Sequence, residues 1–309
     1  MNKGKLTNIL TKDGGVRLIY ADSTGIVQTS VDIHHPSKTV TAALGRCLTA
    51  ASIMGSQLKS EGSTLTLRIM GDGPAGSFIC ISDEKGNVRG CCENPQAELP
   101  PNSEGKLDVG GVVGRNGDIY VVRDYGFGEP YSGFSKIVSG EIAEDITNYY
   151  NVSEQTASVC GLGVRVFPDG TIKGAGGFLL QLMPGADEEE LIPKLQANID
   201  SLGSLSALIA EGKTASDIAD IIFRGIPYSI LEENEMEYKC NCERDKYRRA
   251  IKSLGILELA DMIKSGEEAE IICRFCGTRY AFPPEELSRM YEERKQEIKD
   301  AQTKPEQQA

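Results

Sequence analysis

Four cysteines in the last third of the chain are the residues whose spacing points most directly to chemistry. Cys240 and Cys242 form one close pair, and Cys273 and Cys276 form a second pair beyond residues 243–272. Four thiolates arriving as two short pairs can surround one tetrahedral ion, with Zn–S distances of about 2.3 Å. Gly277 follows the second pair and permits a tight turn that brings backbone N–H groups near the sulfurs. The sequence therefore predicts a site for one Zn²⁺ with these four ligands.

The alternative for these cysteines is a pair of permanent disulfides, which form in oxidising compartments. The N-terminus lacks the apolar core of a secretory signal, and no apolar run approaches the length of a membrane span. We therefore expect a cytoplasmic protein without a membrane partner. In that setting nine cysteines indicate metal or redox chemistry rather than a disulfide scaffold.

Four thiolates around one Zn²⁺ carry a net negative charge, which neighbouring cations could balance. Six basic residues lie close in sequence: Arg244, Lys246, Arg248, Arg249, Arg274 and Arg279. A solvated helix face is the other interpretation of these charges. Crowded thiolates are also targets for oxidants, because the thiolate is the nucleophilic form of cysteine.

Loss of the metal would have structural consequences. Residues 233–290 are too few to build a large hydrophobic core, so a fold of this size usually depends on a structural metal or on disulfides. Zinc supplies about 10–16 kcal/mol of folding free energy in such modules, whereas a domain is stable by only about 5–15 kcal/mol. The sequence thus predicts a module that is folded with zinc and unfolded without it.

These motifs resemble one known family. CNC (240–242), CRFCG (273–277), the segment RRAIKSLGILELADMI, expected to be one bridging helix, and the closing GTRYAF are similar to the 33-kDa heat-shock, redox-regulated chaperonins. The resemblance extends through most of the chain, with LGRCLTAASIMGSQLK, LTLRIMGDGPAG, VRGCCENP and GGFLLQLMPGA. Cys91 and Cys92, within VRGCC, are not part of the four-thiol motif.

The resemblance implies a redox-regulated, ATP-independent holdase chaperone and no enzymatic activity. Oxidation would pair Cys240 with Cys242 and Cys273 with Cys276, release zinc and unfold the module. Client-binding surface would then be exposed to unfolding proteins, and the oxidised form would be a homodimer. A net charge of −12 argues independently against nucleic acid as a general partner, since phosphate binding requires a basic surface.

We expect an α+β protein in four parts. The resemblance implies a large N-terminal α/β-type domain, expected over 1–183 with a mixed sheet, which the predicted strands and helices permit. A helical linker is expected over 184–232; the resemblance makes it regulatory, and an ordinary helical hairpin between domains fits the sequence equally well. The zinc module is expected over 233–290 and a flexible tail over 291–309. The linker is rich in Leu and Ile but interrupted by glycine, so its apolar faces must dock on another surface.

Within the first part we expect a hairpin of strands at 16–21 and 26–31. A helix beginning near Ser37 or Thr39 carries Cys47 in its apolar stripe. Strands are expected at 65–70, 77–82 and 88–92, and two more within 152–183 around the turn at Pro168. We expect a glycine-rich loop and a strand within 108–124, and a helix over 139–149 with Ser139 at its N-cap.

Three further observations bear on other functions. Gly71–Gly76 reads G-x-G-x-x-G, but a strand rather than a helix is expected after it, which favours a tight turn over a dinucleotide site. No GxxxxGK[ST] loop for ATP is present. Cys273 and Cys276 could serve a thiol–disulfide oxidoreductase, although that activity favours a helix N-terminus and a strand is expected here. A constitutive zinc-ribbon interaction module is the remaining alternative.

Overall fold

The computed structural model describes residues 3–303, which divide into two compact units on either side of the Lys239–Cys240 bond. The first unit holds two five-stranded sheets, in the strand orders β10-β1-β2-β9-β8 and β5-β4-β3-β6-β7. The second holds the hairpin β11-β12. The predicted α+β class is confirmed. The expected mixed sheet is corrected, because every ladder between these strands is antiparallel and the parallel pairing is confined to an isolated bridge, Val88–Tyr238.

The first sheet contains the largest correction to the sequence-based prediction. Its strands are β1 (Gly4–Thr11), β2 (Val16–Asp22), β8 (Ser158–Val166), β9 (Ile172–Leu182) and β10 (Tyr228–Met236). The N-terminal hairpin is formed by β1 and β2, with Gly14 at φ 76° in the turn. Residues 26–31, expected as a strand, lie in the helix α1 (Thr24–His34) with Ile26, Val27 and Ser30 buried on one face. The β-branched composition favoured a strand, but the burial follows a helical period.

The second sheet follows the prediction more closely. Its strands are β3 (Thr64–Gly71), β4 (Phe78–Asp83), β5 (Val88–Cys92), β6 (Gly117–Asp124) and β7 (Tyr131–Lys136). The G-x-G-x-x-G stretch is the β3–β4 connection, and the element after it is a strand. A Cβ at Gly73 would lie 2.4 Å from the Val112 carbonyl oxygen, so this glycine permits a close approach of two backbone segments. Strand β7 was not predicted.

Two expected elements of the first unit differ in detail. The glycine-rich stretch contains a short helix, α3 (Val109–Val113), capped by the Asp108 carboxylate. The helix expected from Ser139 is α4 (Ala143–Val152), which begins four residues later. The buried carboxylate of Asp145 accepts hydrogen bonds from the backbone N–H groups of Val138, Ser139 and Ile142, and this holds residues 138–142 in a loop.

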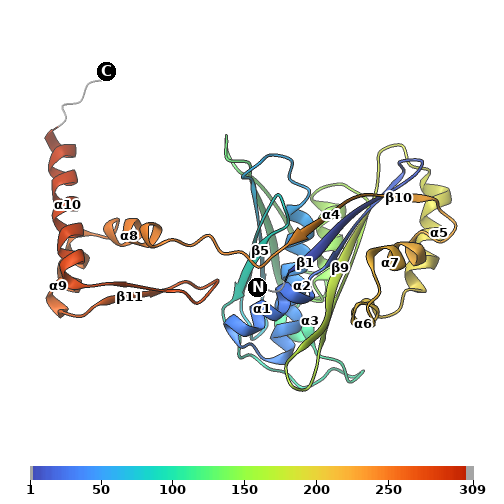
Figure 1. Cartoon of the computed structure of the whole chain (residues 1–309), viewed down its shortest axis with the longest axis horizontal. Coiled ribbons are helices and arrows are strands. Elements are labelled where there is room, and N and C mark those ends of the chain that lie inside the picture. The colour runs from blue at the N-terminus through green and yellow to red at the C-terminus, as the bar shows by residue number, and fades with distance from the viewer. Residues whose placement is uncertain (1–2, 304–309) are drawn as a thin grey trace. The chain divides into compact units, whose positions relative to one another are not determined.

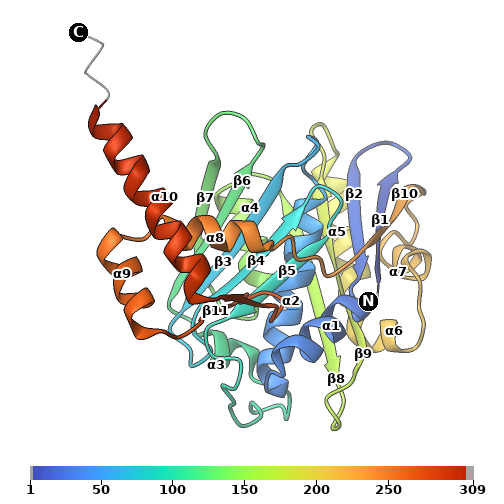
Figure 2. The same ribbon diagram turned by 60° about the vertical axis from the view of Figure 1, so that its left-hand side comes forward.

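Helices separate and cover the sheets in layers (Figures 1 and 2). The long helix α2 (Lys38–Gly55) begins after Ser37, whose hydroxyl accepts from the Val40 N–H, as predicted. It packs between the sheets, and Leu44, Cys47 and Leu48 belong to the main core. The opposite face of the first sheet is covered by α5 (Glu188–Asp200), α6 (Leu205–Ala210) and α7 (Ala215–Ile222).

These three helices and the first part of β10 occupy residues 184–232, the region expected to be the linker, and β10 continues beyond its expected end. The helices form a second core with Leu18, Tyr20, Phe178 and other residues of the first sheet. The linker region does not end as helix, because Tyr228–Met236 forms the edge strand β10 beside β1. The expected boundaries at 184, 233 and 291 remain predictions, whereas the two compact units meet between 239 and 240.

The second unit contains α8 (Arg244–Lys252), α9 (Ile256–Ser265), β11 (Ala269–Ile272), β12 (Arg279–Phe282) and α10 (Pro284–Thr303). The segment expected as one bridging helix is divided into α8 and α9 before Gly255, the N-cap of α9. Its buried apolar core is small and consists of Ile251, Leu259, Phe282, Leu287 and Met290. The predicted flexible tail is helical as far as Thr303, and residues 304–309 lie outside the described part of the chain.

Candidate metal centre

The four predicted ligands come together in the second unit. The sulfurs of Cys240, Cys242, Cys273 and Cys276 all lie within 4.8 Å of one another. Cys240 Sγ is 3.8 Å from Cys273 Sγ, and Cys242 Sγ is 3.3 Å from Cys276 Sγ. Tetrahedral bonds of about 2.3 Å place sulfurs roughly 3.8 Å apart, so this cluster has the size of a four-thiolate metal site. The arrangement can hold a metal ion.

The second cysteine pair sits in the turn between β11 and β12. The Cys273 N–H donates to the Thr278 carbonyl oxygen and the Gly277 N–H donates to the Cys273 carbonyl oxygen, both at 2.9 Å. Gly277 has φ 71°, the left-handed conformation that glycine adopts without strain. Cys-x-x-Cys here ends one strand and precedes another, instead of opening a helix as in thiol–disulfide oxidoreductases.

Hydroxyl groups contact the sulfurs from the surrounding elements. Tyr280 Oη donates to Cys242 Sγ at 3.1 Å, and Thr278 Oγ1 lies 3.1 Å from Cys276 Sγ. Tyr247 donates a hydrogen bond to Cys273. The rings of Tyr247 and Tyr280 are 4.8 Å apart and pack against the small apolar core. These tyrosines therefore connect the metal centre to the packing of the module.

The basic residues expected to balance the thiolates are mostly engaged elsewhere. Arg244 forms hydrogen bonds with Glu286, Arg248 with Glu293, and Arg279 pairs with Glu270. Lys246 donates to the Asn241 carbonyl oxygen. Of the two interpretations of these charges, the contacts favour a solvated face for Arg244, Arg248 and Arg279, whose carboxylate partners join α8 to α10 or β12 to β11. The side chains that contact the sulfurs, those of Tyr247, Thr278 and Tyr280, carry neutral hydroxyls. Sequence reasoning missed Tyr247, Thr278 and Tyr280.

The thiols differ in their ease of ionisation. Burial opposes ionisation of Cys273, but the Tyr247 hydroxyl and the N–H groups of Phe275 and Cys276 lower the pKa of its thiol to about 6. Burial raises the pKa of Cys240 and of Cys242. Cys273 is thus more readily available as a thiolate than Cys240 or Cys242, to begin metal binding or to react with an oxidant.

Replacement of Tyr280 with phenylalanine tests the hydroxyl contact. Outer-shell hydrogen bonds to metal ligands contribute about 10–100-fold to metal affinity. We expect Tyr280→Phe to weaken zinc binding by about tenfold in competition with a chelating dye. Tyr291→Phe is the control, because Tyr291 is a partly buried tyrosine at the same core whose ring contacts Lys295 instead of the sulfur cluster. Equal zinc affinities for the two variants would remove the role assigned to Tyr280.

The other five cysteines lie in the first unit and remain apart from the centre. Cys47, Cys80, Cys91 and Cys160 are buried and Cys92 is half-buried. Burial raises the pKa of Cys160 and of Cys92 to about 12, and it raises the pKa of Cys47 and Cys80 as well. These thiols are therefore protonated at neutral pH.

Oxidation should consequently be confined to one unit. After brief peroxide treatment we expect the four clustered cysteines to be oxidised, with Cys47, Cys80 and Cys160 still reduced. Alkylation under denaturing conditions followed by peptide mass spectrometry measures each position. Oxidation of the first-unit thiols at a rate comparable to the cluster would contradict this prediction.

Comparisons with known proteins identify the family to which a chain with this cluster belongs. Residues 4–283 match the family described as Hsp33 protein. The chain belongs to the Hsp33 family. The 33 kDa chaperonin of Clostridium botulinum is 44% identical over 290 residues, covering 94% of this chain and 98% of the relative. That of Clostridium acetobutylicum is 44% identical over 285 residues, covering 92% and 95%.

The fold agrees with a solved Hsp33 structure as well. The crystal structure of the 33 kDa chaperonin (heat shock protein 33 homologue) from Thermotoga maritima matches with a TM-score of 0.88 and 35% identity, covering 96% of this chain and 100% of that one. Relatives in the Hsp33 family are thus named as chaperonins rather than as enzymes. Among the described helices, none combines the length and apolar character needed to cross a membrane.

Proposed function

We propose that this chain is an ATP-independent holdase chaperone that oxidation switches on. In the reduced state Cys240, Cys242, Cys273 and Cys276 hold one Zn²⁺ and keep the second unit folded. Oxidation forms the disulfides Cys240–Cys242 and Cys273–Cys276, releases zinc and unfolds that unit. Unfolding client proteins then bind the surface that becomes exposed, and the oxidised protein acts as a homodimer in the cytoplasm.

The observation that carries the proposal is the four-sulfur cluster in a unit with few other sources of stability. Five residues form the buried core of that unit, too few to stabilise it without a staple. Zinc held by all four thiolates would form a closed structural site. No coordination position would be left open for a substrate or a catalytic water. Family membership supports the chaperone role.

The region after Met183 supplies a surface that can be uncovered. The apolar residues of α5, α6 and α7, including Leu195, Ile209, Ile218 and Ile222, are buried against the first sheet. Release of these helices would expose apolar area on both sides of the contact, and large exposed apolar patches on soluble proteins bind other chains. We propose that unfolding of the second unit weakens this docking through β10.

The test measures zinc release and client protection in the same sample. Reduced, zinc-loaded protein is treated with peroxide at raised temperature while a chelating dye reports free zinc. Aggregation of a thermally unfolding test protein is followed by light scattering. We expect zinc release and protection to appear together and to reverse with dithiothreitol and zinc. Zinc release without protection would show that the four cysteines are only a structural staple, as in a constitutive zinc module.

A further inference from the structure

Residues 237–239, which we call the strap, carry the chain from β10 to the first cysteine of the sulfur cluster. They leave the edge of the first sheet at Met236 and run beside β5, an edge strand of the second sheet (Figures 1 and 2). The next residue, Cys240, is the first residue of the second unit. A structural change that spreads along the backbone from the second unit to β10 must therefore pass through the strap.

The backbone of the strap is hydrogen-bonded to β5 and to the turn before it. The Val88 N–H donates to the Glu237 carbonyl oxygen at 3.0 Å, and the Lys239 N–H donates to the Val88 carbonyl oxygen at 2.9 Å. The Glu237 N–H donates to Asn87 Oδ1 at 3.1 Å. The strap is thus held at both of its ends, and one of these bonds lies at the residue directly before Cys240.

The side chain of Tyr238 fixes the middle of the strap. It is 1% exposed and belongs to the main core of the first unit. Its hydroxyl donates to the Gly90 carbonyl oxygen at 2.9 Å and accepts from the Gly90 N–H at 3.3 Å. His34 Nε2 lies 3.2 Å from the same hydroxyl and 3.0 Å from the Gly90 carbonyl oxygen. Polar atoms of α1, β5 and the strap therefore meet at the buried end of Tyr238.

Strand β10 has few buried side chains of its own. Residues 229–235 are exposed, and Met236 at the end next to the strap is buried. Backbone pairing with β1 is therefore the main attachment along the strand, and such pairing opens most easily from an end. The strap closes the end of β10 that faces the second unit.

We propose that Tyr238 controls whether unfolding of the second unit reaches the docked helices. This inference rests on the proposed function and specifies its regulation. While Tyr238 is held by Gly90 and His34, unfolding of the second unit stops at Cys240, β10 stays paired with β1, and α5–α7 stay docked. Release of Tyr238 opens the end of β10, and only then does the apolar surface beneath the helices become available to clients.

Replacement of Tyr238 with phenylalanine tests this role in the full chain. The ring stays in the core, but the hydroxyl that bonds to Gly90 is lost, and the buried Gly90 N–H and C=O lose a partner. A change of this kind favours opening by about tenfold. We therefore expect Tyr238→Phe to shorten the interval between zinc release and client protection by about tenfold. The rate of zinc release should not change, and the reduced, zinc-loaded variant should stay inactive.

The interval is measured after peroxide is added to reduced, zinc-loaded protein. A chelating dye reports free zinc, and light scattering by a thermolabile test protein reports client protection at successive times. Opening of buried structure slows about three- to sixfold for every 10 °C of cooling. The two events are therefore close together at raised temperature, and incubation of the oxidised chain at lower temperature before the client is added separates them.

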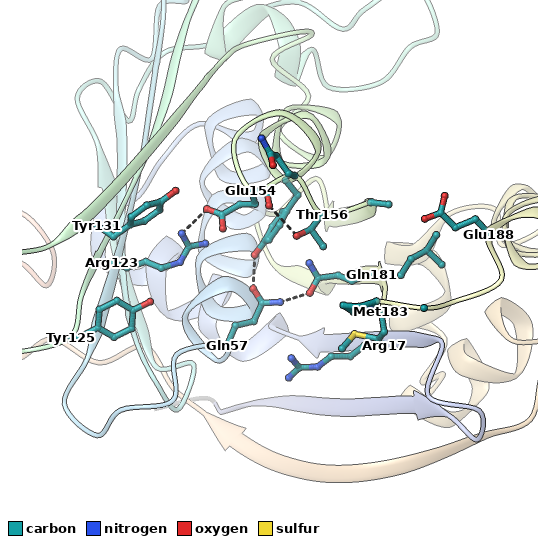
Figure 3. Close-up of a pocket in the computed structure, with 16 residues that line it drawn as sticks. Arg17, Gln57, Arg123, Tyr125, Tyr131, Glu154, Thr156, Gln181, Met183 and Glu188 are labelled. Carbon is teal, nitrogen blue, oxygen red and sulfur yellow. Dashed lines mark hydrogen bonds and ion pairs between the residues drawn. The ribbon is translucent and has the colours of Figure 1, made fainter.

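Tyr150→Phe is the matched control. Tyr150 is 3% exposed and belongs to the same core as Tyr238. Its hydroxyl donates to Gln57 Oε1 at 2.6 Å, and Gln57 donates in turn to Gln181, in the cavity wall shown in Figure 3. This variant loses a buried hydroxyl of the first unit and keeps the strap intact. Its interval should equal that of the unaltered chain.

Hydrogen exchange follows the strap itself, with single amides resolved by peptide fragmentation. In the unaltered chain the N–H groups of Val88 and Lys239 should stay protected after zinc has left and lose protection when client protection begins. In Tyr238→Phe both amides should lose protection earlier. Rapid exchange of these amides in the unaltered chain as soon as zinc leaves would overturn the proposed role of Tyr238.

Two further results would overturn it: equal intervals for Tyr238→Phe and the unaltered chain, or equal shortening in Tyr150→Phe, which would indicate a general loss of core stability. If Tyr238→Phe fails to fold, Asn87→Ala provides the test, because it removes the acceptor of the Glu237 N–H at the other end of the strap. Its interval should shorten severalfold, and an unchanged interval would contradict the proposal. Absence of client protection from every oxidised chain would instead overturn the proposed function.

Discussion

A chain carrying Cys273→Ser and Cys276→Ser should lose its metal and unfold from residue 240 to residue 303 without any oxidant. The two substitutions remove half of a ligand set that contributes about 10–16 kcal/mol to folding. The remaining core of Ile251, Leu259, Phe282, Leu287 and Met290 is too small to compensate. Hydrogen exchange should show rapid exchange throughout this segment, while the second sheet of the first unit, β5-β4-β3-β6-β7, retains its protection.

The same variant should protect a client protein under reducing conditions. Light scattering by an aggregating test protein, with dithiothreitol present, measures this directly. Cys92→Ser is the control, because it removes a half-buried thiol of the first unit and leaves the sulfur cluster intact. A metal-free, unfolded second unit without any client protection would separate unfolding from activation and contradict the proposed switch.

Ile218→Asp should activate the chaperone while zinc stays bound. Ile218 is fully buried where α7 meets the first sheet. The substitution removes apolar contacts worth about 2–5 kcal/mol and places an unpaired carboxylate in the core, which costs several kcal/mol more. This loss of free energy exceeds the stabilisation that the docking of three short helices can supply. We expect reduced, zinc-loaded Ile218→Asp to suppress client aggregation.

The matched control for this variant is Ile192→Asp, the same substitution on α5 at a side chain that is 47% exposed. Its carboxylate can remain in water, so docking and the reduced, inactive state should persist. Zinc content is measured for both variants. If folded Ile218→Asp released its helices, as judged by proteolysis after Met183, and still failed to bind clients, the docking surface would not be the client-binding surface.

The sulfur cluster could be predicted from sequence because its signal is local. Each cysteine pair spans at most four residues, so its two sulfurs must lie close together, and Gly277 marks the tight turn directly after the second pair. The hydroxyl donors were missed although a signal was available. Thr278 and Tyr280 alternate along the chain after Cys276, so they share one face of the strand and both reach the sulfurs. Sequence alone left open whether Arg244 and Arg248 face the thiolates or the solvent, because their carboxylate partners lie on α10, more than 40 residues away.

The fold was predictable where the local pattern and tertiary contacts agree. Helix α2 has a capping serine and a clear apolar stripe, and β3, β4 and β5 lie between recognisable turns. β10 has no such pattern, since Ile230 and Leu231 are followed by acidic residues that remain exposed. It is a strand because its backbone pairs with β1, more than 200 residues earlier. Pairing at that separation leaves no local pattern in the sequence.

The composition of β10 has a consequence for the solubility of the activated protein. If docking of the linker region is lost and this nine-residue strand leaves β1, both strands expose unpaired N–H and C=O groups. Free edges of that kind initiate open-ended sheet assembly between chains, particularly beside concentrated unfolded protein. Glu232, Glu233 and Glu235 give the detached strand a row of like charges, so two copies repel before they can pair. Under the proposed switch, the acidic residues that make β10 a poor strand by sequence would therefore hinder the activated protein from forming fibrils of its own.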